Sequence, residues 1–139
     1  MIRQTVLDGR PRRTVMLHDV SYEHELGYRE LLEGWQRDGT YPVTYAPTVS
    51  RPTDPRNAGW AGRTGRVEAN VADVVRQLRL DPERTVVYIC GNPEMILNVE
   101  RILMDRGFPE FHVKKELYWP KGKQVVEAGV AAGDPADRA

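Results

Sequence analysis

Residues 85–95 read TVVYICGNPEM, and this stretch decides the fold of the chain. Its first six residues, 85–90, are mostly apolar and β-branched, which is typical of a buried strand. A Gly-Asn turn follows. Pro93 suits the first position of a helix that we expect over Glu94–Arg106, and Gly107 suits the position just after its end. The stretch therefore predicts a strand that leads directly into a helix.

The same alternation of strands and helices extends over the rest of the chain. In chain order we expect a helix remnant at Met1–Leu7, a strand at Thr14–Val20, a helix that Ser21 caps and that ends near Gly39, a strand at Tyr41–Ser50, a long loop at Arg51–Gly65, a helix from Val67 to Leu78, the strand at Thr85–Cys90, its helix, and a last strand at Phe111–Tyr118. Such alternation is typical of an α/β fold with a parallel sheet and helices on both faces. Pro42 and Pro47 favour an edge position for the second strand, because proline cannot donate to a ladder.

The length and composition exclude several classes of protein. A chain of 139 residues has room for one core, and we expect an ordered domain at 1–119 and a disordered tail at 120–139. Its 20 basic side chains balance 20 acidic ones, so bulk charge gives no reason to expect nucleic-acid binding. No apolar run approaches the roughly 20 residues of a membrane span. The start of the chain does not read as a secretory signal, and the expected location is cytoplasmic.

Cysteine and histidine are too sparse for a disulfide framework or a metal site. Cys90 is the single cysteine, and the three histidines lie far apart in the sequence. We therefore expect no metal.

Parallel sheets bind ligands at the carboxyl ends of their strands, so the residues that follow each strand are the candidates for a site. After the third strand come Gly91, Asn92 and Pro93. Glycine permits a close approach to the backbone, and the helix that follows offers free N–H groups, so this turn suits a dinucleotide or a phosphate. The alternative is an ordinary turn beside a buried Cys90 thiol.

Ser50 and Arg51 follow the second strand, with Arg56, Arg63 and Arg66 nearby in the sequence. A hydroxyl and a guanidinium suit a phosphate monoester, which arginine binds through two parallel hydrogen bonds. An acid here would suit the ribose hydroxyl of NAD, whereas arginine suits the 2′-phosphate of NADP. The alternative is a set of solvated loop arginines.

The last strand ends in Glu116-Leu117-Tyr118-Trp119. An acid followed by two aromatic residues could lie over a planar ring and handle a proton near it. The alternative is a terminal strand whose aromatic side chains cover the core.

Four segments together resemble the ferredoxin–NADP⁺ reductase family, bacterial type. ICGNPEM resembles its C-G-x-P-x-M segment, and RTVMLHDVSYEHELGYRELLEGW resembles its second strand and helix, including the Leu-x-Tyr spacing of Leu26 and Tyr28. TVSR followed by GRV resembles its NADP-binding segment, and KELYW resembles its terminal E-x-Y-W. The resemblance covers about residues 2–119 and concerns the NADP-binding half of the family alone.

The resemblance implies roles for individual residues. Ser50, Arg51 and Arg66 would hold the adenosine 2′-phosphate, and Arg66 fits that place better than Arg63. The catalytic residues would be Cys90, beside the nicotinamide, and Glu116, near the reacting centre. The other cofactor-binding residues would be Gly91, Asn92, Pro93, Met95, Tyr118 and Trp119, of which Met95 would pack behind Cys90 and Gly91 and the two aromatic residues would stack on flavin or adenine.

Two parts of the family pattern are not found in this sequence. One is the flavin-binding barrel with its R-x-Y-[ST] motif, and the other is the first strand with its Gly-Thr-Gly-x-x-Pro loop, so the chain resembles an N-terminally truncated domain. In the family that strand lies at the centre of a 3-2-1-4-5 sheet. We therefore expect the chain to take a strand from a partner, to associate with itself, or to close its sheet by pairing Thr14–Val20 with Thr85–Cys90.

The implied function is NADP(H) binding within a flavin-dependent oxidoreductase. Such an enzyme transfers hydride between NADP(H) and FAD and electrons to ferredoxin, flavodoxin or an oxygenase partner. The FAD-binding half would belong to the same longer chain or to a separate subunit of a split reductase, and the present chain alone would be inactive. The alternative is a non-catalytic nucleotide-binding or interaction module.

Overall fold

The structure is a computed structural model, and it describes residues 12–117. The helix remnant expected at Met1–Leu7 and the tail expected at 120–139 lie outside these residues. The chain divides into two compact units, with the boundary between Asp81 and Pro82. This division differs from the single core that the length predicts, and each unit has its own set of buried apolar residues.

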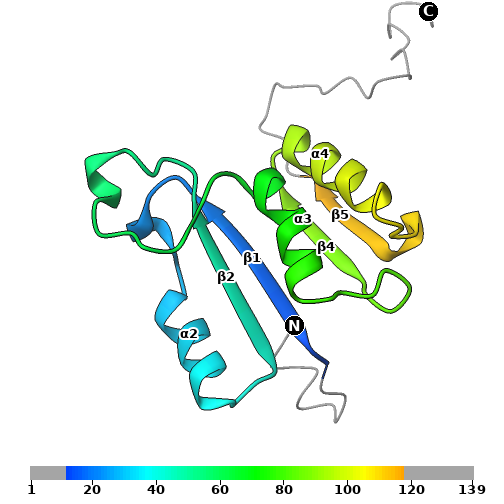
Figure 1. Ribbon diagram of the computed structural model, residues 1–139, viewed down its shortest axis with the longest axis horizontal. Coiled ribbons are helices and arrows are strands. Elements are labelled where there is room, and N and C mark those ends of the chain that lie inside the picture. Colours follow the sequence, from blue (N-terminus) through cyan, green and yellow to red (C-terminus); the bar gives the residue numbers. More distant parts are fainter. Residues whose placement is uncertain (1–11, 118–139) are drawn as a thin grey trace, which may run out of the picture. The chain divides into compact units, whose positions relative to one another are not determined.

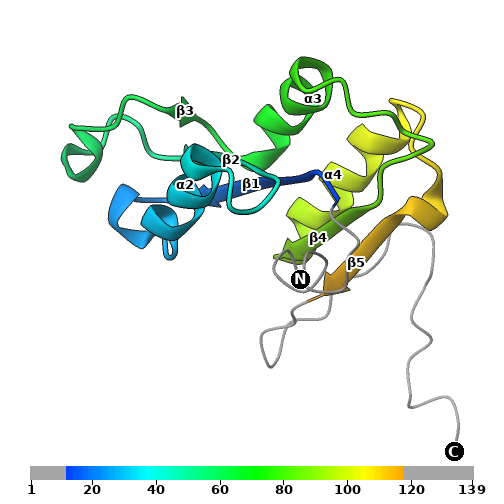
Figure 2. The ribbon, with the colours of Figure 1, turned by 90° about the horizontal axis from the view of Figure 1, so that it is seen from below.

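The first unit is built on a three-stranded parallel sheet in the order β1-β2-β3, of which Figure 1 labels β1 and β2 and Figure 2 labels β3. Its elements are β1 (Thr14–Val20), the short helix η1 (Glu23–Glu25), α2 (Arg29–Asp38), β2 (Val43–Val49), the short helix η2 (Pro55–Asn57), β3 (Arg63–Thr64) and α3 (Val67–Gln77). The register places Thr14 beside Val43 and Val20 beside Val49. The loops that follow β1 and β2 therefore leave the sheet at the same end.

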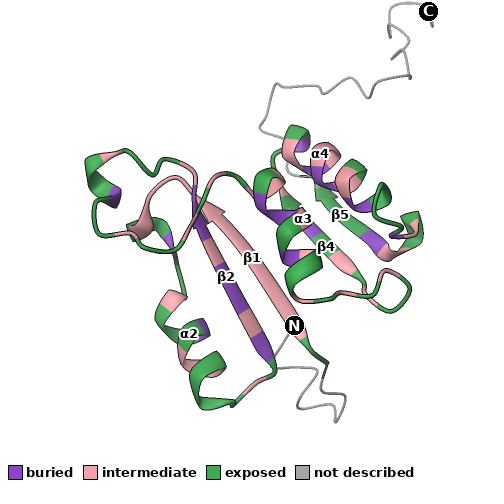
Figure 3. Cartoon of the chain, in the orientation of Figure 1, coloured by how far each residue is buried: buried purple, intermediate pink, exposed green. Residues whose placement is uncertain are grey.

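Both faces of β2 are covered at its carboxyl end. Thr48 and Val49 are both fully buried, and Figure 3 colours the carboxyl end of β2 as buried. Neighbouring residues of a strand point to opposite faces. α3 covers the face of Thr48, since the Asn70 amide lies 3.4 Å from the Thr48 hydroxyl. α2 also packs on β2. The expected α/β fold with a parallel sheet is confirmed.

The second unit is a two-stranded parallel sheet with one long helix. Its elements are β4 (Val87–Gly91), α4 (Pro93–Met104), the short helix η3 (Glu110–His112) and β5 (Val113–Leu117). α4 packs on both strands (Figure 2) and buries Ile96 and Leu103 almost completely. An ion pair of 2.7 Å between Lys115 and Glu100 ties β5 to α4.

Each of the two sheets is a separate set of hydrogen-bonded strands. Within residues 12–117, β1 hydrogen-bonds to β2 alone and β4 to β5 alone. Of the three expected arrangements, the pairing of Thr14–Val20 with Thr85–Cys90 is therefore not found, while a strand from a partner and self-association stay predictions.

The expectation of a single helix after Ser21 is wrong, because the chain forms a short helix, leaves the helical conformation and then begins a second helix. Tyr22, not Ser21, precedes η1, and its N–H donates to the Glu25 carboxylate at 3.0 Å. Gly27 lies two residues after the end of η1, and the next residue, Tyr28, adopts a left-handed conformation with φ of 63°. A residue in that conformation cannot continue a right-handed helix, so α2 begins only at Arg29.

Two further expectations need correction. β2 is not an edge strand at its carboxyl end, because β3 pairs there with Thr48 and Val49. Pro47 precedes this short ladder, so its missing N–H costs no bond to β3. β4 is not buried on both faces, since Tyr88 is 65% exposed while Ile89, which points the opposite way, is buried. None of the helices described here is long and apolar enough to span a bilayer.

Candidate nucleotide-binding site

The first group of expected site residues lies at the carboxyl end of β1 and β2. The Ser50 N–H donates to the Val20 carbonyl at 2.9 Å, and its hydroxyl donates to the same oxygen at 3.3 Å. Arg51 is exposed and donates one hydrogen bond of 2.9 Å to the Tyr22 hydroxyl. The structure therefore brings Ser50 and Arg51 to the place where a parallel sheet binds its ligands.

Asn57 joins the two loops at this end of the sheet. Its side chain is almost fully buried, and its oxygen accepts a bond of 2.8 Å from the Glu23 N–H. Its amide donates to the carbonyls of Ser21 and Arg51 at 3.0 and 2.8 Å. Asn57 is not among the site residues that the sequence predicts, because an Asn in a loop rich in Pro and Gly carries no signal of burial.

The structure separates the two arginines that compete for the phosphate role. Arg66 directly precedes α3 and is exposed, and its carbonyl accepts a bond of 3.0 Å from Asn70. Arg63 instead directs its guanidinium to Gln77, the last residue of α3, to which it donates a short hydrogen bond. The Arg63 guanidinium is therefore bonded to a side chain of its own unit.

Asp19 is a second residue that our sequence analysis missed. It lies near the end of β1, and its carboxylate accepts a bond of 3.3 Å from the Val67 N–H at the start of α3. Burial raises the pKa of Asp19, and the nearby Glu68 adds to this effect, while the Val67 bond and Arg66 oppose it. One oxygen of each of these carboxylates is buried, with no partner among the described residues.

The second group of expected site residues lies at the carboxyl end of β4 and β5. The register places Cys90 directly beside Glu116, and both residues are exposed. The alternative of a buried thiol at Cys90 is therefore wrong. The alternation of β4 explains this: Ile89 points towards α4, so Cys90 points away from it.

The turn after β4 has the geometry expected of a strand that leads into a helix. Pro93 opens α4, and the Asn92 side chain accepts a bond of 2.9 Å from the Met95 N–H. The Met95 methyl group lies where a side chain at Gly91 would begin, so Met95 packs directly against this glycine. Any larger residue at position 91 would have to displace it.

Of the remaining expected residues, Tyr118 and Trp119 lie outside the described part of the chain. Residues 12–117 contain no group of three or more His, Cys, Asp or Glu side chains that could hold a metal ion. The other expected residues form two groups: Ser50, Arg51 and Arg66 in the first unit, and Cys90, Gly91, Asn92, Pro93, Met95 and Glu116 in the second.

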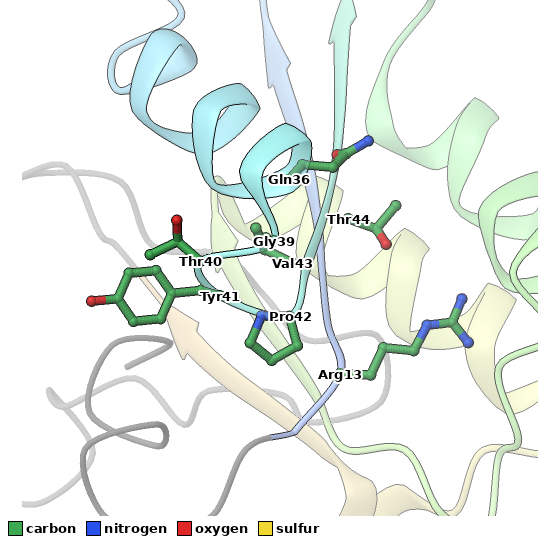
Figure 4. Close-up of a pocket in the computed structure, with 8 residues that line it drawn as sticks. All are labelled: Arg13, Gln36, Gly39, Thr40, Tyr41, Pro42, Val43 and Thr44. Atoms are coloured by element: carbon green, nitrogen blue, oxygen red, sulfur yellow. The ribbon is translucent and has the colours of Figure 1, made fainter.

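One cavity of about 480 Å³ lies elsewhere in the first unit (Figure 4). Its lining comes from the end of α2, the turn after it and the start of β2. Gln36 lines it and also accepts a bond of 2.7 Å from the Tyr45 N–H. The cavity is at the amino end of β2, opposite to Ser50 and Arg51, so it is not the candidate site.

Comparison with known proteins identifies the family. The family described as the oxidoreductase NAD-binding domain matches residues 1–101. The chain belongs to this family. It is similar to ferredoxin–NADP reductase B of Sorangium cellulosum, with 31% identity over 122 residues, which are 85% of this chain and 48% of that protein. It is also similar, with 44% identity over 43 residues (31% of this chain, 16% of that protein), to oxidoreductase NAD-binding domain-containing protein 1 of Danio rerio.

A solved structure supports the same relationship. A ferredoxin NADP⁺ reductase from Neisseria gonorrhoeae with bound FAD and NADP matches with a TM-score of 0.59 and 25% identity, over 74% of this chain and 43% of that one. The chain thus spans about half the length of the Sorangium reductase and less than half of the Neisseria chain. The expected relationship to the nucleotide-binding domain of the ferredoxin–NADP⁺ reductase family is confirmed.

Proposed function

We propose that this oxidoreductase domain is the NADP(H)-binding portion of a flavin-dependent reductase. The whole enzyme would transfer hydride between NADP(H) and FAD and pass electrons to ferredoxin, flavodoxin or an oxygenase component. The FAD would be bound mainly by a part that this chain does not contain, whether in a longer chain or in a separate subunit. We place the enzyme in the cytoplasm.

The observation that carries this proposal is the register of β4 and β5. It sets Cys90 beside Glu116, two residues that the family resemblance assigns to the nicotinamide end of the site. Gly91 follows Cys90 and has no side chain, so a flat ring could approach the end of β4 closely. α4 begins two residues later, and its free N–H groups favour a negatively charged ligand nearby.

The residues at the end of β2 fit the phosphate of NADP better than the free ribose hydroxyl of NAD. Ser50, Arg51 and Arg66 would hold the 2′-phosphate, for which guanidinium groups are good donors. An acid would be needed to bind a ribose hydroxyl instead. Asp54 is an acid in this loop, but its carboxylate accepts bonds of 2.9 and 3.0 Å from the Arg56 guanidinium.

The residues at the end of β4 and β5 would orient the nicotinamide. The bound nicotinamide and flavin supply the hydride chemistry themselves. The Glu116 carboxylate would lie beside the Cys90 thiol near the ring, and Met95, packed against Gly91, would support the strand end from behind. Asn92 and Pro93 would fix the start of α4, while Tyr118 and Trp119 would stack on flavin or adenine.

Nuclear magnetic resonance on the ¹⁵N-labelled chain tests this proposal. NADP⁺ is added in steps, and the backbone amide signals are followed. We expect signals of Arg51 in the first unit and of Gly91 and Asn92 in the second to shift with the same apparent affinity. A chain whose signals do not respond to NADP⁺ would instead be a non-catalytic interaction module. Shifts confined to the cavity at the start of β2 would also contradict the proposal.

A further inference from the structure

Two arginines of the first unit converge on one hydroxyl group. Tyr22 lies just after β1, and its oxygen accepts bonds of 2.9 Å from Arg51 and 2.6 Å from Arg56. The Arg56 side chain is 55% exposed, and Arg51 is also exposed. Two cationic groups are thus gathered on a neutral oxygen at the surface, within reach of a ligand.

Arg56 is held in place although it is exposed. Asp54 accepts three bonds of 2.9 to 3.0 Å from the Arg56 backbone and guanidinium, which lower the pKa of Asp54 to about 2. The Arg56 guanidinium also lies 3.6 Å from the centre of the Tyr22 ring, and the His24 ring stacks parallel to that of Tyr22. Tyr22 and Asp54 therefore set the direction of the Arg56 donors before any ligand binds.

The hydrogen-bonding capacity left at the two guanidinium groups and at the Tyr22 hydroxyl consists of donors. A phenol oxygen that already accepts two bonds retains its own O–H as a donor. Arg51 uses one of its five N–H groups on Tyr22, and arginine has no acceptor. Asp54 neutralises the charge of Arg56, so Arg51 supplies the net positive charge. Such a cluster suits an anion with several acceptor oxygens, for which phosphate is a strong candidate.

We propose that Arg56 is a further phosphate-binding arginine, in addition to Arg51 and Arg66, that Tyr22 and Asp54 position it beside Arg51, and that its ligand is the 2′-phosphate of NADP(H). The inference rests on the proposed function, which it deepens. It adds Arg56 as a specificity-determining residue and Tyr22 as a positioning residue. Neither is among the residues that the family resemblance assigns to the cofactor.

Isothermal titration calorimetry on the full chain tests this inference with two probes. Adenosine 2′,5′-bisphosphate carries the phosphate in question, and adenosine 5′-monophosphate does not. In Arg56→Ala we expect the affinity for the bisphosphate to fall about tenfold or more, as for the loss of a charge-assisted hydrogen bond, with no change for the monophosphate. In Tyr22→Phe the same ratio of affinities should fall by a smaller factor.

Arg76→Ala is the matched control, because Arg76 also pairs with an aspartate, Asp73, at 2.8 Å and is exposed on α3. It should leave both affinities unchanged. Circular dichroism checks that every variant keeps the wild-type fold. If Arg56→Ala leaves the bisphosphate affinity unchanged while Arg51→Ala lowers it, the inference is wrong and the proposed function stands. If the wild-type chain shows no preference for the bisphosphate, both are wrong.

Discussion

Cys90 and Glu116 lie side by side on neighbouring parallel strands, and both are exposed. They are 26 residues apart in the sequence, and α4 lies between them. The strand–helix–strand connection therefore brings a thiol and a carboxylate to one face of the β4–β5 sheet. Because Cys90 is the single cysteine of the chain, its chemistry can be followed without interference.

Bound NADP⁺ should protect the Cys90 thiol from modification. A nicotinamide ring beside the end of β4 would block the approach of a thiol reagent such as dithionitrobenzoate. We expect saturating NADP⁺ to slow this reaction at least severalfold, as measured by the absorbance of the released thiolate. Adenosine 2′,5′-bisphosphate, which has no nicotinamide, should give no protection. Equal rates with and without NADP⁺ would show that Cys90 is remote from the ligand.

Arg66→Ala and Arg63→Ala should differ in their effect on NADP⁺ binding. Arg66 lies exposed at the start of α3, whereas Arg63 is bonded to Gln77 at its end. Loss of one charge-assisted bond to phosphate weakens binding by about ten- to a hundredfold, and we expect this for Arg66→Ala alone. Calorimetry with NADP⁺ measures both. The assignment of Arg66 fails if Arg63→Ala has the larger effect.

Asn57→Ala should destabilise the first unit more than most loop substitutions. The change removes the three hydrogen bonds that the buried Asn57 side chain makes with the Glu23 N–H and with the carbonyls of Ser21 and Arg51. We expect a loss of about 2–4 kcal/mol in the free energy of unfolding, measured by urea denaturation. Thr53→Ala, in the same loop and exposed, should change it by less than about 0.5 kcal/mol. Similar midpoints for the two variants would refute this role of Asn57.

Asp19→Asn should stabilise the chain at neutral pH. Burial raises the pKa of Asp19 above its ordinary value of 3.8, so the folded chain binds this proton more tightly than the unfolded chain. The stability that the group contributes is present below the ordinary value and is lost as the pH rises through the folded-state pKa. An asparagine cannot ionise, and its amide oxygen can still accept the bond from Val67.

The variant should therefore melt at a higher temperature than the wild type at pH 7, and the difference should shrink as the pH falls towards 3.8. Thermal melts across this range measure it. Burial lowers the pKa of His18. This residue is present in both proteins, so its titration contributes to both curves of melting temperature against pH. A lower melting temperature for the variant at pH 7 would mean that the charged Asp19 stabilises the start of α3.

Local sequence patterns predicted those strands and helices that are marked by an apolar stretch or by a residue typical of a helix start. The apolar stretch before Gly91 forms β4, and Pro93 opens α4. The terminal strand was expected two residues too early, because Glu110–His112 forms a short helix that no periodicity marks. The left-handed Tyr28 was also not foreseen, since few residues other than glycine adopt that conformation and nothing local indicates it.

The residues of the candidate site likewise fall into some that the sequence predicts and others that it does not. Ser50, Arg51, Cys90 and Glu116 could be predicted because each lies at or near the end of a strand. The contacts of Tyr22 with Arg56 and the burial of Asn57 could not, because they join two loops that are about 35 residues apart in the sequence. Such contacts are set by the register of β1 and β2, which only the folded chain provides.

The comparison of NADP⁺ with NAD⁺ in calorimetric titrations of this chain tests the central claim most directly. The two ligands differ by the 2′-phosphate alone. The arginines at the end of β2 should bind NADP⁺ at least about tenfold more tightly than NAD⁺. The Asp54 carboxylate is already bonded to Arg56 and so is not free to bind the ribose hydroxyl of NAD⁺. Equal affinities, or tighter binding of NAD⁺, would contradict the claim that this domain is built to bind NADP(H).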